Sequence, residues 1–371
     1  MTAETPDPLL LAALATVQDP ELRRPITELG MVESARIIGS VARVKVLLTI
    51  AACPLRSTIV ADVTAAASTV PAVDSVQVEV GAMSPQQRAT LRAGLKHRSV
   101  PFGDPGSLTR VIAVASGKGG VGKSSLTANL ACAMAADGLR VGIIDADVHG
   151  FSIPGLMGIT QAPTRVDEMI LPPVAHGVKV ISIGMFVKGN VPVIWRGPML
   201  HRALEQFLTD VHFGDLDVLL LDLPPGTGDI AISVAQLLPG SELLVITTPQ
   251  SAAAQVAERA GSIAAQTGQK VLGVVENMSW LQLPDGTRME PFGSGGGAEL
   301  SARLSTTLGT EVRLLGSIAL DPVLREGGDS GLPVVLGHPQ APAAQEIVRI
   351  ARGLARRPRG LSGLKLPVTP V

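Results

Sequence analysis

The chain has 371 residues, with 31 basic and 32 acidic side chains and a formal net charge of −1. This length exceeds what one hydrophobic core usually serves, so it predicts two domains. The balanced charge provides no bulk attraction for nucleic acid. The aromatic content of 2%, with no tyrosine, also argues against stacking on single-stranded bases. We therefore expect no nucleic-acid partner.

The N-terminal residues and the cysteines bear on the compartment. The first ten residues, MTAETPDPLL, have no basic region ahead of an apolar stretch, and no apolar run is long enough to cross a bilayer. Two cysteines, Cys53 and Cys132, are too few for a disulfide framework and are typical of a reducing compartment. We expect a cytoplasmic protein without a transmembrane segment.

The first hundred residues predict a small α+β domain, which we place at residues 5–96. Its expected elements are a helix from about Pro8 to Val17, a hairpin of strands over 31–38 and 41–50, a helix from Leu55 to about Thr69, and a strand through 76–80. The segment 97–108 has two prolines, two glycines and few large apolar residues, so we assign it as a linker.

From residue 109 onward, apolar strand runs alternate with helical segments. The runs are RVIAVAS, RVGIID, VKVISI, LDVLLLD, ELLVITT, KVLGVVEN and EVRLLGS. This rhythm predicts a doubly wound, mostly parallel α/β sheet over residues 109–357. Its last helix is expected from about Ala343 to Arg357, and residues 358–371 form a tail punctuated by proline and glycine.

A phosphate-binding loop follows the first of these strands. Residues 117–124, GKGGVGKS, have the Walker A spacing and open a predicted helix. Glycines allow consecutive backbone N–H groups to point at phosphates, and the helix N-terminus adds partial positive charge. Lys123 is predicted to reach the β- and γ-phosphates of ATP, and Ser124 to ligate Mg²⁺. The expected nucleotide-binding residues are Gly117, Lys118, Gly119, Gly120, Val121, Gly122, Lys123 and Ser124.

Carboxylates end two other predicted strands. Asp145 ends the strand RVGIID, and Asp147 lies two residues further on. We expect Asp147 to orient the attacking water and Asp145 to hold the water shell of the metal. The alternative is an acidic loop that only caps a helix. Asp222 occupies the Walker B position and is predicted to bind Mg²⁺ through water. The stiff loop 223–229, LPPGTGD, follows it and can sense the γ-phosphate.

Asn277 ends the strand KVLGVVEN and offers both a donor and an acceptor, which suits the adenine edge. Residues 317–321 are expected on the other side of the base. The alternative is that Asn277 is only a turn residue.

These motifs together resemble the Mrp/ApbC family of iron–sulfur cluster carrier ATPases. The matching segments are 116–124, DADVHG at 145–150, VIWRGPM at 193–199, LDLPPGTGD at 221–229, VVENMS at 274–279 and FGSGGGAEL at 292–300. The first domain is similar to the SufT-like small domain that is often fused to these ATPases. Its matching residues are Asp19-Pro20-Glu21-Leu22, Glu28-Leu29-Gly30-Met31-Val32 and Cys53-Pro54-Leu55.

The resemblance implies a homodimer in which Lys118 reaches the nucleotide of the partner subunit and takes part in catalysis with Lys123 and Asp147. The alternative for Lys118 is a solvated surface lysine. It also implies an iron–sulfur cluster bridging the subunits through a Cys-x-x-Cys pair after the Asn-Met-Ser motif. Here the corresponding segment, 280–290, contains no cysteine. The bridging site therefore does not carry over to this chain.

The two cysteines are expected to have different roles. Cys132 lies within the helix after the phosphate loop and is expected in the packed core. Cys53 lies between a strand and a helix, where backbone N–H groups favour the thiolate, so it is the candidate ligand for an iron–sulfur cluster. The alternative for Cys53 is a small buried side chain at a strand end.

The predicted function is a dimeric, ATP-hydrolysing carrier or assembly factor that passes clusters to apo iron–sulfur proteins or assembly factors. The alternative is a nucleotide-switched positioning protein similar to MinD and ParA. The basic helix 347–354 supports that alternative if it binds a membrane surface. The other interpretation is that it is the closing helix of the sheet. A third class, a metabolic kinase, lacks any marked acceptor pocket.

Overall fold

The computed structural model places most of the chain. It describes residues 7–355 apart from 21, 23, 50–54, 72, 96–99, 105, 148–149, 167–168, 187–196, 227–228 and 251–262. Cys53, most of the 193–199 motif and the tail 358–371 thus lie outside the described residues.

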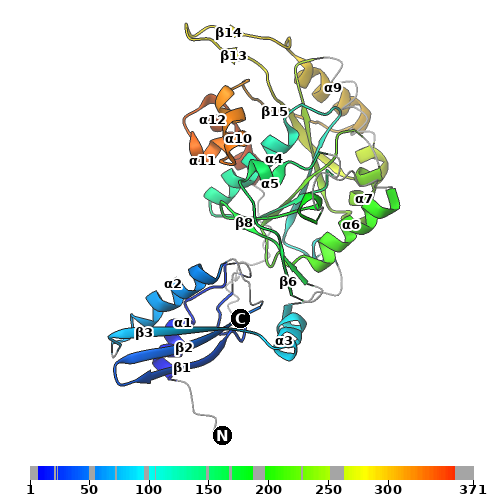
Figure 1. Ribbon diagram of the computed structural model, residues 1–371. Helices are drawn as coiled ribbons and strands as arrows, with labels where there is room; N and C mark the ends of the chain where they lie inside the picture. The colour runs from blue at the N-terminus through cyan, green and yellow to red at the C-terminus, as the bar shows by residue number, and fades with distance from the viewer. Residues whose placement is uncertain are drawn as a thin grey trace, which may run out of the picture.

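The N-terminal part, which we call the small unit, is a three-stranded sheet with helices (Figure 1). Its elements are α1 (Pro8–Leu14), β1 (Val32–Ile38), β2 (Val41–Leu48), α2 (Arg56–Ala67) and β3 (Ser75–Ala82). β1 and β2 form an antiparallel hairpin, and β3 lies parallel to β2 after the α2 crossover. The expected order of helices and strands is confirmed.

One helix of this part was not predicted. α3 (Pro85–Leu95) begins at a capping box in which Gln87 Oε1 accepts from the N–H of Ser84, and Ser84 Oγ accepts from the N–H of Gln87. A serine followed three residues later by glutamine is a helix-start signal in the sequence. The sequence therefore contains the start signal of this helix.

The second part, which we call the nucleotide unit, is built on an eight-stranded sheet of order β15-β12-β11-β4-β10-β5-β9-β8. Its strands are β4 (Arg110–Ser116), β5 (Val141–Asp145), β8 (Val174–Ala175), β9 (Val178–Ser182), β10 (Val218–Asp222), β11 (Glu242–Thr247), β12 (Lys270–Glu276) and β15 (Leu314–Ser317). Adjacent strands are parallel except β8, which is antiparallel to β9. The predicted doubly wound α/β class is confirmed.

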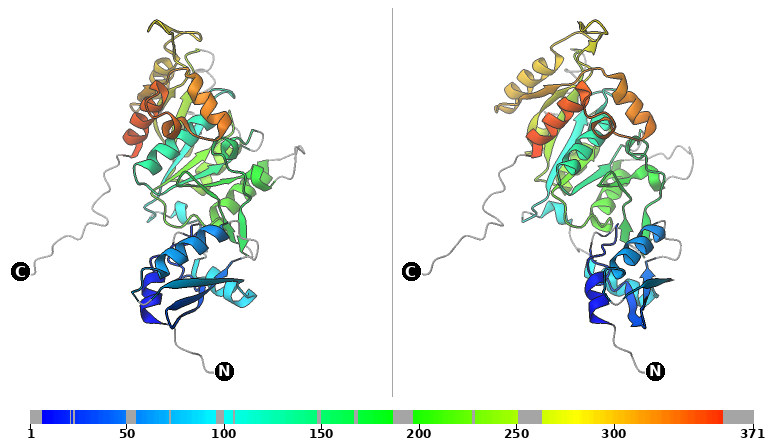
Figure 2. Two further views of the ribbon diagram at one scale, coloured as in Figure 1. Left: turned by 60° about the vertical axis from the view of Figure 1, so that its left-hand side comes forward. Right: turned by 90° about the vertical axis from the view of Figure 1, so that its left-hand side faces the viewer.

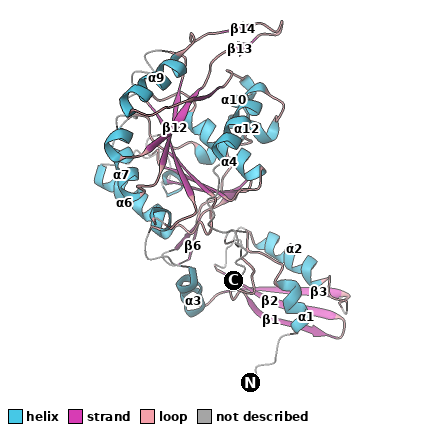
Figure 3. Ribbon diagram, turned by 180° about the vertical axis from the view of Figure 1, so that it is seen from behind, coloured by secondary structure: helices cyan, strands magenta, loops and turns pink. Residues whose placement is uncertain are grey.

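Helices cover both faces of this sheet (Figures 2 and 3). On one face lie α6 (Gly197–Asp210), α7 (Asp229–Leu237) and α9 (Gly296–Leu308). On the other lie α4 (Lys123–Ala136), α5 (Ile153–Leu156), α10 (Pro322–Ser330), α11 (Val334–Gly337) and α12 (Pro342–Ala355). The central strands are buried on both faces, which explains their continuous apolar runs.

The helix α12 closes the sheet. Its apolar side chains Ile347, Ile350 and Leu354 are buried in the core cluster that also contains α4. Its basic residues are paired within the fold: Arg349 with Glu346, and Arg352 with Asp137 of the turn after α4. The closing-helix interpretation is therefore correct, and the membrane-surface interpretation is wrong, because the apolar face is already covered. Within the described residues, none of the helices combines the length and apolar character that crossing a membrane requires.

The two units share apolar contacts. The hairpin of β6 (Thr164–Val166) and β7 (Met169–Leu171) belongs to the nucleotide unit by sequence. Its side chains Val166, Met169 and Leu171 are nevertheless buried in the core cluster of the small unit. The segment assigned as a linker contains the 3-10 helix η1 (Pro101–Gly103), whose Phe102 is buried against the nucleotide unit. The chain between the units is thus packed at least over these residues.

Candidate functional site

The phosphate loop connects β4 with α4, at the carboxyl edge in the middle of the sheet. Parallel sheets of this class bind ligands at this edge, where the strand order reverses. Gly120 and Gly122 have φ angles of 79° and 81°, in the left-handed region that favours glycine. Beside Gly120 a Cβ would meet nothing within 4 Å, so open space adjoins the loop backbone there. The loop backbone thus has the glycine conformations and the open side that phosphate binding requires, and the phosphate contacts stay a prediction.

Asp222, at the end of β10, is the centre of a buried polar network. Lys123 Nζ lies 2.6 Å from Asp222 Oδ2, and Ser124 Oγ donates to the same oxygen at 2.5 Å. Thr127 Oγ1 donates to Asp222 Oδ1 at 2.8 Å. The structure thus brings together the predicted phosphate lysine, the predicted Mg²⁺ hydroxyl and the Walker B carboxylate. In this arrangement the Lys123 ammonium is held by a carboxylate with which a phosphate would compete.

Asp145 and Asp147 have different surroundings. Asp145 is fully buried, and its oxygens accept from Ser182 Oγ at 3.0 Å and from the N–H groups of Asp147 and Ile153 at 3.2 and 3.3 Å. Burial, and then the neighbouring Asp222, raise the pKa of Asp145 to about 7. Through these contacts Asp145 holds the loop after β5 in place.

Asp147 lies on that loop and faces the phosphate lysine. Its Oδ2 is 4.0 Å from Lys123 Nζ, and its Oδ1 accepts from the N–H of Gly150 at 3.1 Å. The side chain is 9% exposed, so a water molecule beside it would be largely shielded from bulk solvent. These distances place a carboxylate next to the phosphate loop, where a general base or a water-orienting group must lie.

Asn277 follows β12 and packs on the phosphate loop. Its Nδ2 donates to the carbonyl of Val121 at 2.9 Å, which fixes the orientation of the amide. Gly122 is required here, because a Cβ at that position would lie 2.3 Å from Asn277 Nδ2. Asn277 Oδ1 is buried and accepts no hydrogen bond from the described residues. This oxygen needs a donor, and the exocyclic amine of adenine is one.

Residues 317–321, predicted to flank the base, run beside the end of β12. Ile318 donates its N–H to Glu276 O, and its carbonyl accepts from the N–H of Ser279.

Lys118 is partly exposed at the second position of the loop. Its carbonyl accepts from Ser116 Oγ at 3.0 Å, which fixes the backbone. Among the residues that the structure places, none forms a hydrogen bond or ion pair with its ammonium group. The loop after β10 packs against the same region, since Gly226 donates its N–H to Ser116 O at 2.8 Å.

Three contributions to the site were missed by the sequence analysis. Thr127 binds Asp222, and it could have been found because it lies four residues after Lys123, on the same helix face. Ser182 pairs with Asp145 across β5 and β9, and this register is not visible in the sequence. Glu276 Oε2 accepts from the N–H of Gly297 at 2.7 Å, so the glycine-rich start of α9 is packed closely on β12.

The segment after Asn277 forms a small exposed hairpin of β13 (Leu281–Gln282) and β14 (Arg288–Met289), which projects from the sheet (Figure 1). Its turn is held by Asp285 Oδ1, which accepts from Thr287 N and Oγ1. The guanidinium of Arg288 lies 4.5 Å from the centre of the Trp280 ring. This hairpin has no cysteine at the place where the family resemblance locates the cysteine pair.

The cysteines are unlike each other. Cys132 is fully buried in α4 among apolar side chains, and burial raises the pKa of its thiol to about 12. The prediction of a core residue is confirmed. Cys53 lies outside the described residues, so its role stays a prediction. In the described part of the chain, no three histidine, cysteine, aspartate or glutamate side chains gather as a metal site.

Chemically, the carboxyl edge can hold a nucleoside triphosphate. The loop amides and Lys123 suit its phosphates, and Asn277 Oδ1 suits an amino group on the base. Ser124 and Asp222 provide oxygen ligands of the kind that Mg²⁺ prefers, so the residues present fit this metal.

Comparison with known proteins agrees with this geometry. The family model described as NUBPL iron-transfer P-loop NTPase matches residues 107–355, and one described as iron-sulfur cluster assembly protein matches residues 10–80. A relative from Mycobacterium tuberculosis, named iron-sulfur cluster carrier protein, is 60% identical over 364 residues, covering 96% of this chain and 95% of the relative. A protein of the same name from Deinococcus radiodurans is 44% identical, covering 93% and 94%.

A solved structure also matches the nucleotide unit. It is a nucleotide-binding protein in complex with ADP from Archaeoglobus fulgidus, 38% identical, with a TM-score of 0.51. The match covers 60% of this chain and 86% of that one.

Proposed function

The chain belongs to the iron-transfer P-loop NTPase family, and from this premise we propose that it is a dimeric carrier of iron–sulfur clusters that binds and hydrolyses ATP. Nucleotide binding and hydrolysis close and open the dimer and so control the transfer of a cluster to an apo-protein. The observation that carries the nucleotide part is the network in which Lys123, Ser124 and Thr127 converge on Asp222 beside the glycine loop.

Each residue of the site has one role in this proposal. The amides of residues 117–124 and Lys123 bind the phosphates, and Asn277 Oδ1 accepts from the amino group of adenine. Ser124 and Asp222 would hold Mg²⁺, which neutralises charge on the phosphates when bound. Asp147 orients the attacking water. Asp145 keeps the loop that carries Asp147 in position and, as the sequence predicts, would hold the water shell of the metal.

Lys118 supports the dimer in this proposal. None of the described residues binds the ammonium group of Lys118. Because this group lies on the phosphate loop, it is available to a second nucleotide site. We propose that it reaches the phosphates in the partner subunit, in the way that an arginine finger supplied in trans does.

The cluster is the cargo, and its ligands differ from those that the resemblance implies. The hairpin β13–β14 has no cysteine, and Cys132 is buried with a pKa of about 12, so neither provides a thiolate. Cys53 is the remaining thiol. One Cys53 in each subunit gives a dimer two thiolates. This is fewer than the four that usually hold a cluster, which suits a labile cluster that is passed to a recipient protein.

The proposal is tested by anaerobic reconstitution with iron and sulfide, with and without Mg-ATP. We expect iron and acid-labile sulfide to bind in a dimer, with an absorbance that is lost in Cys53→Ser. Cys132→Ala is the matched control and should keep both. Equal iron in the wild-type protein and in Cys53→Ser would exclude this ligand. ATP-dependent binding to liposomes or DNA without iron uptake would instead favour a positioning ATPase.

A further inference from the structure

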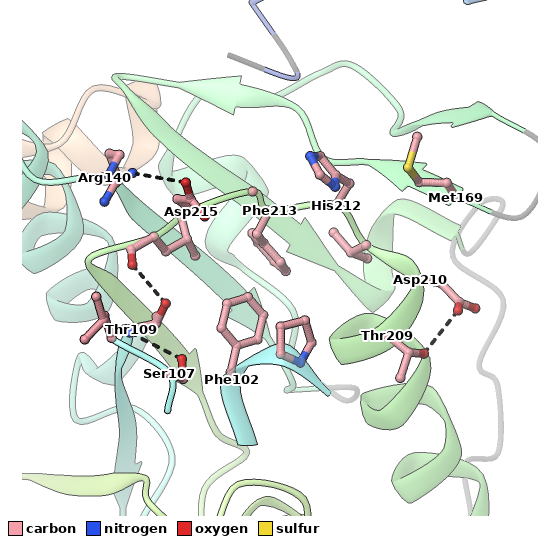
Figure 4. A pocket seen from close by; sticks show the side chains of 15 residues that line it. Phe102, Ser107, Thr109, Arg140, Met169, Thr209, Asp210, His212, Phe213 and Asp215 are labelled. Atoms are coloured by element: carbon pink, nitrogen blue, oxygen red, sulfur yellow. Dashed lines mark hydrogen bonds and ion pairs between the residues drawn. The ribbon is translucent and has the colours of Figure 1, made fainter. Parts of the chain in front are cut away.

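The cavity shown in Figure 4 lies at the edge of the sheet where the strands begin, away from the phosphate loop, and has a volume of about 380 Å³. Its aromatic rings, Phe102 and Phe213, are buried against each other. Asp215 in its wall is already paired with Arg140, at 3.7 Å. These groups need no ligand, whereas the carboxyl edge of the sheet holds a strained residue next to the nucleotide site.

The strained residue is Met278, which directly follows Asn277. Its φ angle is 58°, in the left-handed region that a long side chain seldom adopts. Among the described residues, His176 is the other non-glycine residue with a positive φ, and it lies in the tight turn between β8 and β9, where such angles are usual. Met278 instead lies just beyond the end of β12. Strain of this kind persists only where the surrounding contacts impose it, and it gathers at functional sites.

Backbone hydrogen bonds to both neighbouring strands impose this conformation. Asn277 donates its N–H to the end of β11 at 2.8 Å and so continues the pairing of β12 with β11. On the other side, Ile318 donates its N–H to Glu276 O at 2.8 Å, and its carbonyl accepts from the N–H of Ser279 at 2.9 Å. In a regular parallel ladder that carbonyl would accept from the N–H of residue 278. One extra residue is therefore inserted, which is a β-bulge, and Ser279 Oγ donates to Glu276 O at 3.2 Å across it.

The bulge changes the direction of the side chains. Consecutive side chains of a regular strand point to opposite faces. Here Asn277 and Met278 both approach Gly122 of the phosphate loop, because a Cβ added at Gly122 would clash with Asn277 Nδ2 and would lie 3.8 Å from Met278 Cε. Gly122 has a φ angle of 81° and directly precedes Lys123, the first residue of α4. Two neighbouring side chains thus cover the same turn of the loop.

We propose that Met278 is a positioning residue for nucleotide binding. A glycine has no side chain of its own to fix its conformation, so Gly122 must be held by its neighbours. Met278 packs on it beside Asn277 and keeps the N–H groups of the loop in the direction that phosphates require. This role rests on the proposed function and adds to it. Because the contact is with the loop and not with the base, Met278 supports ATP and GTP alike, whereas Asn277 Oδ1 favours adenine.

The test compares Met278→Ala with Met278→Leu in the full chain, by calorimetry with Mg-ATP and with Mg-GTP. We expect Met278→Ala to bind both nucleotides about three- to tenfold more weakly, because the apolar contact of a partly buried side chain with the loop is lost. KM should rise by the same factor with kcat unchanged, since the contact is equal in the ground state and the transition state. Leucine keeps an apolar side chain of similar volume, so Met278→Leu should retain most of the affinity.

Met278→Gly separates this role from an effect on stability alone. Glycine adopts a φ angle of 58° without strain, so Met278→Gly should be at least as stable to urea as Met278→Ala. Both variants lack the side chain, so we expect equally weak ATP binding in the two. Wild-type affinity in Met278→Gly would show that residue 278 acts only through its backbone, and the proposal would be wrong.

Met289→Ala is the matched control, because Met289 is an exposed methionine on β14, and it should bind both nucleotides as the wild type does. Wild-type affinity for ATP and GTP in Met278→Ala would overturn the positioning role and leave the proposed function standing. A loss for ATP alone would also overturn this role, since it would place Met278 against the base. A wild-type protein that binds neither nucleotide would refute the proposed function and this role with it.

Discussion

The phosphate loop and the β13–β14 hairpin follow two strands of the same sheet at the same edge, and they differ in almost every physical respect. Around the loop, Lys123 and Asp222 are at most 6% exposed, and several polar groups converge on one carboxylate. The hairpin is mostly exposed: Arg288 contacts Trp280 within it, and at its base Leu320 donates its N–H to Trp280 O. The loop region has the buried charged groups that suit a charged ligand, and the hairpin has none.

This difference separates the two parts of the proposed function. A buried carboxylate and ammonium are retained only where they are paired, so the loop network constrains which ligand can enter. The hairpin imposes no such constraint, since it buries no polar group that requires a ligand. We infer that nucleotide binding depends on the loop and is independent of the hairpin, whereas cluster binding must use residues elsewhere.

Substitution of the phosphate lysine should have the largest effect on nucleotide binding. Lys123→Ala removes charge-assisted hydrogen bonds worth about 1.5–3 kcal/mol each, so we expect a loss of about 10³-fold in ATP affinity. Calorimetry with Mg-ATP measures this. Lys270→Ala is the control, because Lys270 is an exposed lysine at the start of β12 that pairs with Glu242. Wild-type affinity in Lys123→Ala would refute the assignment of the cradle.

Asp147→Asn should retain binding and lose turnover. The amide keeps an oxygen for the N–H of Gly150 but removes the charge near Lys123. We expect kcat to fall by about 10²–10⁴-fold, as is typical when general acid–base help is removed, with the Kd for ATP unchanged. Phosphate release assays measure kcat. Asp137→Asn, an acid paired with Arg352 outside the site, should hydrolyse ATP normally; if Asp147→Asn does so too, another residue orients the water.

Asn277→Ala should have a smaller effect that depends on the base. It removes the acceptor Oδ1 and the bond to Val121 O, so we expect about tenfold weaker ATP binding. GTP carries a carbonyl oxygen where ATP carries its amine, so its affinity should change less. Titration of both nucleotides measures the ratio. An equal loss for ATP and GTP would mean that Asn277 only supports the loop.

Most of the nucleotide site could be predicted from sequence because its parts are local. Gly117 to Ser124 form one continuous loop, and Asp145 and Asp222 end strands that are recognisable as buried runs. Ser182 could not be predicted, because its contact with Asp145 depends on the register between β5 and β9. Sequence periodicity also could not show that Val166, Met169 and Leu171 complete the core of the small unit, since that contact joins distant parts of the chain.

The smallest effect is expected at the hairpin, and it sharpens the contrast with the loop. Arg288→Ala removes a cation–π contact that is worth about 0.5–1 kcal/mol at an exposed site, so hydrogen exchange within residues 281–289 should be a few-fold faster. Because the hairpin supplies no ligand, ATP turnover and iron content should equal those of the wild type. Arg325→Ala, an exposed arginine paired with Asp329 on α10, controls for the loss of surface charge. A fall in iron content in Arg288→Ala alone would show that the hairpin takes part in cluster binding despite its lack of cysteine. Cluster binding would then not depend only on residues elsewhere.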